Sequence, residues 1–199
     1  MTLVLASASP ARLQTLRNAG IEPVVIVSGV DESQLDGLPP AERALQPAEL
    51  KGAAVAERAE VPAGALVLGC DSVLDLDGAA LGKPGDAEEA VRRWQDMRGR
   101  SGVLHTGHCL RDTATGRVAA ATASTTVHFA DVADEEIAAY VATGEPLVVA
   151  GAFTVDGLGG AFVTGIEGDH HNVVGVSLPL VRELVAELGH SWTGLWTRS

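Results

Sequence analysis

The chain of 199 residues lacks several features that define particular classes of protein. No apolar run approaches the roughly 18 to 20 residues that a membrane-spanning helix needs. The N-terminus has no basic region and only a brief apolar stretch, so we expect no signal peptide. There is no repeat or low-complexity tract, and 46% of the residues are hydrophobic, too many for a disordered chain. We therefore predict one folded domain over residues 1–199.

Cysteine is scarce, and its placement excludes a disulfide framework. The chain has two cysteines, Cys70 and Cys109, which lie far apart and form no C-x-x-C pair. One of them closes an apolar run that is typical of a buried strand, so buried free thiols are expected. The cytoplasm is the compartment that this pattern favours.

Positive charge is also in short supply. The 14 Lys and Arg residues face 26 Asp and Glu residues, which gives a formal net charge of −12. This balance argues against binding to nucleic acid or to an anionic membrane surface. A small phosphorylated ligand is still compatible with it, provided that the cations are concentrated locally and a metal ion assists.

The apolar pattern that is present predicts an α/β fold with a mixed, twisted sheet and flanking helices. Strands are expected over residues 3–5, 23–27, 65–70, 102–111, 117–129 and 161–166. Helices are expected from Ser9 to Gly20 and over residues 48–59, 86–97, 134–143 and 177–188, whereas residues 36–47 resemble an exposed loop with a helical turn at 41–45. Asp77-Gly78 predicts a hairpin turn. The pair His170-His171 is expected to lie on an extended segment with its side chains pointing opposite ways, which disfavours a zinc site. Neither G-x-G-x-x-G nor G-x-x-x-x-G-K-[ST] occurs, so no dinucleotide fold or P-loop is indicated.

The first helix begins in an unusual way. Ser9 is a good N-cap, and Pro10 suits the first helical position. A capping box would place Glu or Gln at position 12, whereas Arg12 opposes the helix dipole there. An anion held by free backbone amides, by the hydroxyls of Ser7 and Ser9 and by the guanidinium would account for this arrangement. The segment thus predicts a phosphate site, the alternative being a surface arginine that only aids solubility.

More polar signals follow predicted strands or begin helices. They are Asp31-Glu32, Lys51, Cys70-Asp71-Ser72 and Gly82-Lys83-Pro84. Because ligands of α/β sheets gather at the carboxyl ends of strands, Asp71 is expected to project there at the end of its strand. Each residue also has a simpler interpretation: Asp71 as a turn residue, Glu32 as the start of a loop, and Lys51 as part of a solvated helix face.

Eight motifs occur in order along nearly the whole chain. They are L-A-S-x-S-P-x-R, V-D-E, a helical Lys, G-x-D-[ST]-V, G-K-P, Y-V-x-x-x-E-P, A-G-x-[FY]-x-[VI]-x-G and E-G-x-x-x-N-V-x-G, at residues 5–12, 30–32, 51, 69–73, 82–84, 140–146, 150–157 and 167–175. Each motif alone is weak, but the ordered set closely resembles the Maf family of nucleoside triphosphate pyrophosphatases. The resemblance implies a two-lobed domain with a central cleft, like that of inosine triphosphate pyrophosphatases. It also implies hydrolysis of nucleoside triphosphates, non-standard ones included, to monophosphate and pyrophosphate with Mg²⁺ or Mn²⁺.

The resemblance assigns the chemistry to particular residues. The family's catalytic aspartate falls on Asp71, which would take a proton from the attacking water or hold the metal that activates it. Glu32 lies close to the family's acidic metal position and would share the ion with Asp71.

Charge on the triphosphate, which builds up as pyrophosphate leaves, would be neutralised by Arg12, Lys51 and Lys83. Ser7 and Ser9 would donate hydrogen bonds to phosphate oxygens.

At three positions the chain departs from the family pattern. Many members have a second arginine where this chain has Ala11, a Thr where it has Ser72, and a Gln where it has Asp156. In the family these positions vary with nucleotide preference, and the set here differs from the patterns linked to dTTP and UTP or to 7-methyl-GTP. Asp156 could accept hydrogen bonds from an amino or imino group of the base.

Two rival functions stay open on the sequence. One is a phosphatase that releases orthophosphate from the γ position, and the other is a nucleotide-binding regulator of cell division or septum formation with little turnover. The resemblance also makes a homodimer plausible, with Trp94, Trp192 or Trp196 either at its interface or covering the core.

Overall fold

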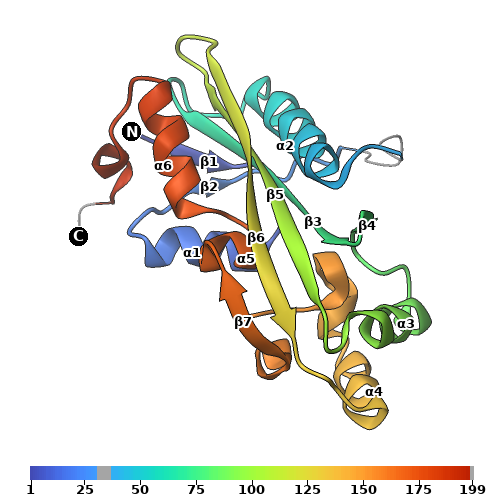
Figure 1. Cartoon of the computed structure of the whole chain (residues 1–199). Helices are drawn as coiled ribbons and strands as arrows, with labels where there is room; N and C mark the ends of the chain where they lie inside the picture. The colour runs from blue at the N-terminus through green and yellow to red at the C-terminus, as the bar shows by residue number, and fades with distance from the viewer. Residues whose placement is uncertain (31–36, 198–199) are drawn as a thin grey trace.

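The computed structural model describes residues 1–30 and 37–197, and one seven-stranded mixed sheet runs through this part of the chain (Figure 1). The strand order is β2-β1-β3-β5-β6-β7, with β4 paired to β3. Strands β2 and β3 are parallel to β1, and the other pairs are antiparallel. The strands are β1 Leu3–Leu5, β2 Val24–Val25, β3 Leu66–Leu76, β4 Ala79–Leu81, β5 Ser101–Asp112, β6 Val118–Phe129 and β7 Val163–Glu167. The predicted mixed α/β fold is confirmed.

Helices cover both faces of this sheet. They are α1 Pro10–Asn18, α2 Pro40–Ala56, α3 Ala87–Met97, α4 Asp134–Ala142, α5 His170–Val174 and α6 Leu178–Glu187. Val55 of α2 packs with Val4 and Val67, whereas Val181 of α6 packs with Leu5 and other side chains on the opposite face. The long strands β3, β5 and β6 continue to a second group of helices, α3 and α4, so the molecule has two lobes (Figure 1).

Each lobe has its own apolar core. In the lobe of α3 and α4, Trp94 is fully buried and makes edge-to-face contacts with Phe129, Tyr140 and Phe162. Because Trp94 fills this core, the suggestion that it contributes to a subunit interface is wrong. Trp196, by contrast, is 51% exposed.

The structure confirms the predicted start of the first helix and the predicted hairpin turn. The Ser9 hydroxyl caps α1 by accepting a hydrogen bond from the Arg12 N–H at 3.4 Å, and Gly20 follows the helix at φ +80°. Asp77 and Gly78 both have positive φ, which confirms the predicted hairpin between β3 and β4.

The prediction of a loop over residues 36–47 is wrong from Pro40 onward, because α2 begins at Pro40 and continues through Pro47. The helix lies directly on the sheet, where two glycines let its backbone approach. A Cβ atom at Gly69 would come within 2.1 Å of the Ala48 carbonyl oxygen, and one at Gly107 within 2.2 Å of the Ala44 carbonyl oxygen. Burial of this helix face outweighs the hydrogen bond that Pro47 cannot donate.

Three other expectations also need correction. The strand predicted over 23–27 is only two residues long, and as a sheet edge it leaves Val24 and Val25 about 40% exposed. Strand β3 does not end at Asp71 but continues to Leu76, since β5 pairs with it on that side. The His170-His171 pair is not extended: it opens α5, because the Asp169 side chain caps the helix by accepting from the His171 N–H.

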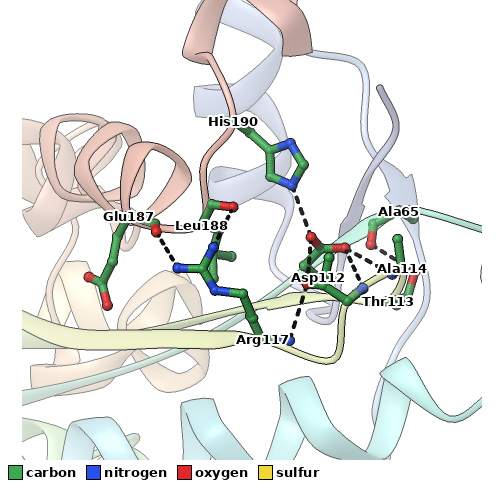
Figure 2. Close-up of polar contacts among 9 residues, drawn as sticks. Ala65, Asp112, Thr113, Ala114, Arg117, Glu187, Leu188 and His190 are labelled. Carbon is green, nitrogen blue, oxygen red and sulfur yellow. Dashed lines mark hydrogen bonds and ion pairs between the residues drawn. The ribbon is translucent and has the colours of Figure 1, made fainter.

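A cluster of polar contacts ties the tip of the β5–β6 hairpin to the end of α6 (Figure 2). The Arg117 guanidinium donates to the carbonyl oxygens of Glu187 at 2.7 Å and Leu188 at 3.2 Å. Asp112 is 2% exposed, and its carboxylate lies 3.0 Å from His190 Nε2. These contacts join residues about 70 to 80 positions apart and lock the C-terminal helix onto the sheet.

A membrane-crossing helix, judged by length and apolar character, is not found in the described part of the chain.

Candidate active site

A cavity of about 790 Å³ lies where the two lobes meet. Its walls come from the start of α1, from α2, β3 and the β4–α3 loop, and from residues 148–150, 153–156 and 173–175. This volume suits a small-molecule ligand. Among the described residues, every predicted site residue lines it: Ser7, Ser9, Ala11, Arg12, Lys51, Asp71, Ser72, Lys83 and Asp156. Glu32, the expected second metal ligand, lies outside the described residues.

Asp71 lies in the part of β3 that extends beyond the end of β1, and there it lines the cavity. Pairing of β1 with β3 ends at Leu5 and Leu68, so Asp71 lies beyond the last parallel neighbour. Its Oδ1 is 2.7 Å from Lys51 Nζ on α2, in an ion pair whose side chains are 21% and 12% exposed. The structure thus brings the expected catalytic carboxylate and one expected phosphate-binding cation into direct contact.

The guanidinium of Arg12 is largely committed to the protein itself. Its Nη1 donates to the Ser7 hydroxyl at 3.1 Å and to the Cys70 carbonyl at 3.0 Å, its Nη2 to the Ser72 hydroxyl at 3.0 Å, and its Nε to the Gly175 carbonyl at 2.7 Å. An arginine has five N–H donors, so one Nη2 hydrogen is left over among the described contacts. Arg12 therefore binds β3 on both sides of Asp71, an arrangement that no local sequence pattern predicts.

The two serines of the first turn keep their hydroxyl hydrogens available. Ser7 Oγ accepts hydrogen bonds from Arg12 and from the Ser9 N–H, and Ser9 Oγ accepts from the Arg12 N–H. Within the described residues neither hydroxyl donates to the protein. Each can therefore donate to an anionic ligand in the cavity.

Ser72 belongs to a relay that leads into the protein interior. Its hydroxyl lies 2.9 Å from Thr106 Oγ1, which donates to the Asn172 carbonyl at 3.2 Å. Since the Thr106 hydrogen is used in that bond, Ser72 must donate to Thr106 while it accepts from Arg12. Ser72 could then affect the ligand only by the space that it occupies or by accepting a hydrogen bond through its remaining lone pair.

Behind this relay lies His108, a residue with no catalytic signal in the sequence. Burial, reinforced by the nearby charge of Arg12, lowers the pKa of His108 to about 4. Its Nε2 accepts from the Ser177 N–H at 2.8 Å, so its Nδ1–H donates to the Thr106 carbonyl at 2.9 Å. His108 is thus a neutral, structural side chain.

The β4–α3 loop that carries Lys83 is clamped by α3. Arg93 Nη1 donates to the Gly82 carbonyl at 2.6 Å, and the Glu89 carboxylate accepts from the Gly85 N–H at 2.7 Å. Glu89 and Arg93 also form an i,i+4 ion pair with each other. The bond from Gly85, assisted by Arg93, lowers the pKa of Glu89. These contacts hold the backbone of the loop from which the exposed side chain of Lys83 extends.

The cavity also contains two cations that were not predicted. Arg43 of α2 and Arg93 of α3 line it together with Arg12, Lys51 and Lys83. Positive charge is thus concentrated locally in a chain of net charge −12, as a phosphorylated ligand would require. In the sequence, the i,i+4 spacing of Glu89 and Arg93 is the one pattern that indicates a partner for Arg93 on the helix.

The described residues fit a divalent ion only in combination with a ligand. No three His, Cys, Asp or Glu side chains in residues 1–30 and 37–197 gather as a metal cluster. Mg²⁺, however, is commonly held by one or two carboxylates together with substrate phosphate oxygens and water. Asp71 offers a carboxylate of this kind beside the cations expected to hold a triphosphate.

A smaller cavity of about 240 Å³ opens beside the first. Ala11, Val174 and Asp156 line both cavities, and the rest of its wall comes from α1, α5 and α6. Ala11 and Asp156, two of the expected specificity positions, therefore lie where the two cavities adjoin.

A family model and several named relatives agree on the family of this chain. A family model described as Maf-like protein matches residues 2–188. A relative from Streptomyces avermitilis is 65% identical over 98% of this chain and 94% of its own length, and one from Salinispora tropica is 63% identical over 100% and 88%. A relative from Nostoc punctiforme is 50% identical over 97% and 96%. All three are named nucleoside triphosphate pyrophosphatase. A solved nucleoside-triphosphatase/dITP/XTP pyrophosphatase from Mycobacterium abscessus matches with a TM-score of 0.45 and 15% identity over 94% of each chain, too distant to bear on function.

Proposed function

Because the chain belongs to the Maf family, we propose that it is a nucleoside triphosphate pyrophosphatase that hydrolyses its substrate, standard or modified, to the monophosphate and pyrophosphate. The observation that carries this proposal is the cavity in which Asp71 meets Lys51 and which Lys83 also lines. A carboxylate beside several cations suits attack by water on a bound polyanion. The names of the close relatives support the same reaction.

In this mechanism the carboxylate of Asp71 takes a proton from the water that attacks the α-phosphorus, or orients that water. Lys51 lies beside it at 2.7 Å and would neutralise the phosphoryl group as charge builds. Lys83, the remaining N–H of Arg12 and the hydroxyls of Ser7 and Ser9 would bind the other phosphate oxygens. Pyrophosphate would then leave into a positively charged part of the cavity.

Mg²⁺ or Mn²⁺ would be held by Asp71 together with phosphate oxygens. When bound, such an ion polarises the phosphoryl oxygens and neutralises their charge. The expected role of Glu32 in holding it stays a prediction.

The reaction is tested by product analysis in ¹⁸O-labelled water, with a panel of standard and modified triphosphates and with Mg²⁺ or Mn²⁺. Attack at the α-phosphorus places the label in the monophosphate and releases unlabelled pyrophosphate. Labelled orthophosphate as the first product would instead identify a γ-phosphatase. Tight binding with no product from any triphosphate would favour the nucleotide-responsive regulator.

We also propose the cytoplasm as the working compartment and a homodimer as the assembly. Both cysteines are free and buried, so the described fold contains no disulfide that would need an oxidising compartment. The exposed Trp196 is the tryptophan best placed to contact a second subunit. Light scattering on the purified chain would give twice the monomer mass if the dimer forms.

A further inference from the structure

Residues 153–159, here called the Asp156 loop, fold around a single carboxylate. Glu145 accepts hydrogen bonds from the Thr154 hydroxyl at 2.5 Å, the Leu158 N–H at 3.1 Å and the Gly159 N–H at 3.2 Å. The Tyr140 hydroxyl donates to the same carboxylate at 3.1 Å. Burial alone would raise the pKa of Glu145, but these bonds outweigh it and lower the pKa. The carboxylate is therefore ionised, and it accepts four hydrogen bonds.

The loop is shaped to fit this carboxylate. A Cβ atom at Gly157 would come within 2.8 Å of both Glu145 oxygens, and one at Gly159 within 2.5 Å of the Tyr140 hydroxyl oxygen. A larger residue at Gly157 would displace the Glu145 carboxylate, and one at Gly159 would also meet the Thr154 carbonyl oxygen at 2.8 Å. Close approach of the backbone to Glu145 thus explains Gly157, and close approach to Tyr140 explains Gly159.

The support beneath the loop is rigid. Tyr140 is 3% exposed and packs edge-to-face on Trp94 and Phe162. Trp94 Nε1 in turn donates to the Ala152 carbonyl at 2.8 Å, immediately before the loop. The loop is thus fastened at its start by Trp94 and at its end by Glu145, both based on the core of one lobe.

Asp156 lies at the exposed crest of this loop and lines both cavities. Its side chain makes no hydrogen bond or ion pair to any described residue, so the region that it can reach depends on where the loop holds its Cα atom. We propose that Glu145 is a positioning residue that sets base selectivity by holding Asp156 toward the substrate. This inference rests on the proposed function, because it requires that Asp156 meets the base of a bound triphosphate.

The test compares selectivity, defined as the ratio of kcat/KM for the best triphosphate of a panel to that for a poor one. In E145Q the side-chain NH₂ would face backbone N–H groups, so the loop should loosen. We expect the ratio to fall about tenfold in D156N, whose amide oxygen accepts a hydrogen bond more weakly than an ionised carboxylate does, and about fivefold or more in E145Q. The double variant should show no further change beyond D156N, because Glu145 acts through Asp156.

A matched control is E135Q, the same chemical change at an exposed position of α4, which should leave the ratio unchanged. If E145Q fails to fold, T154V removes one of the loop's bonds to Glu145 at nearly constant volume and should lower the ratio in the same direction. A general loss of structure would reduce kcat/KM equally for all triphosphates.

The outcomes separate the proposal from the function beneath it. Unchanged selectivity in folded E145Q and T154V, with activity intact, would overturn the positioning role and leave the reaction standing. A further loss of selectivity in the double variant would also overturn it. If the unmodified enzyme hydrolyses no triphosphate, the proposed function fails, and this inference fails with it.

Discussion

At the scale of single residues, Arg12 lines a cavity suited to phosphate but donates most of its hydrogen bonds to the protein itself. Its position in the first turn predicts an anion partner, and it does line the cavity. Its hydrogen bonds to Cys70, Ser72 and Gly175 could not be predicted, because they depend on how segments up to 163 residues away return to α1. Local motifs thus identified the residue, but long-range packing decided how most of its donors are used.

The variant R12K tests this structural role. A lysine has no planar fork and cannot serve four acceptors in these directions, so buried carbonyl oxygens would lose their partners. We expect the free energy of unfolding to fall by about 2–3 kcal/mol, measured by urea denaturation. R17K on the exposed side of the same helix is the control and should unfold as the unmodified protein does. Equal unfolding midpoints for R12K and the unmodified protein would contradict the account.

At the scale of elements, sequence signals were reliable where a helix end or a turn is encoded locally. Ser9-Pro10 and Asp77-Gly78 act within a few residues, and both predictions are confirmed. The first half of α2 could not be predicted, because Pro39, Pro40 and Pro47 are typical of a loop. The contact that stabilises this part of the helix comes from Gly69 and Gly107 on the sheet. The contacts of α3 with the Lys83 loop could not be predicted either, because they form only when the loop folds back onto the helix.

The Lys83 clamp predicts a specific effect of R93A. Without the Arg93 bond to the Gly82 carbonyl, the loop can move and Lys83 is no longer held toward the phosphates, while one cation of the cavity is also lost. We expect kcat/KM for triphosphates to fall about tenfold or more in steady-state assays. The neighbouring R92A removes an exposed arginine whose partner Glu88 lies 3.9 Å away, and it should keep full activity. Similar activities of the two variants would refute the clamp.

At the scale of the whole molecule, two lobes share one sheet (Figure 1), and residues of both lobes line the cavity. The order of motifs predicted that distant segments converge, but not which contacts hold the molecule together. The tie between Asp112 and His190 (Figure 2) is an example, because neither residue lies near a recognisable motif. Such contacts arise only from the complete chain path.

This tie predicts how stability depends on pH. Hydrogen bonds from His190 first, and then from Thr115 and backbone N–H groups, lower the pKa of Asp112 from 3.8 to about 2. Because the folded-state pKa lies below the unfolded value, the carboxylate contributes fully above about pH 4 and progressively less as pH falls toward 2. The contribution amounts to about 2 kcal/mol.

Urea denaturation of D112N and of the unmodified protein at several pH values measures this effect. The difference in unfolding free energy should be largest near neutral pH and should shrink between pH 4 and pH 2. A difference that stays constant over this range would show that Asp112 does not carry the dependence.

The most direct test of the central claim is pyrophosphate release by D71N, measured with Mg²⁺ or Mn²⁺ beside D75N, which changes another aspartate of β3. We predict that D71N folds normally and releases no pyrophosphate, because its side chain can neither take the proton of the attacking water nor hold a divalent ion as a carboxylate does. D75N should remain active, since the Asp75 carboxylate binds the Gly78 N–H at the hairpin outside the cavity. Undiminished pyrophosphate release by D71N would contradict the account.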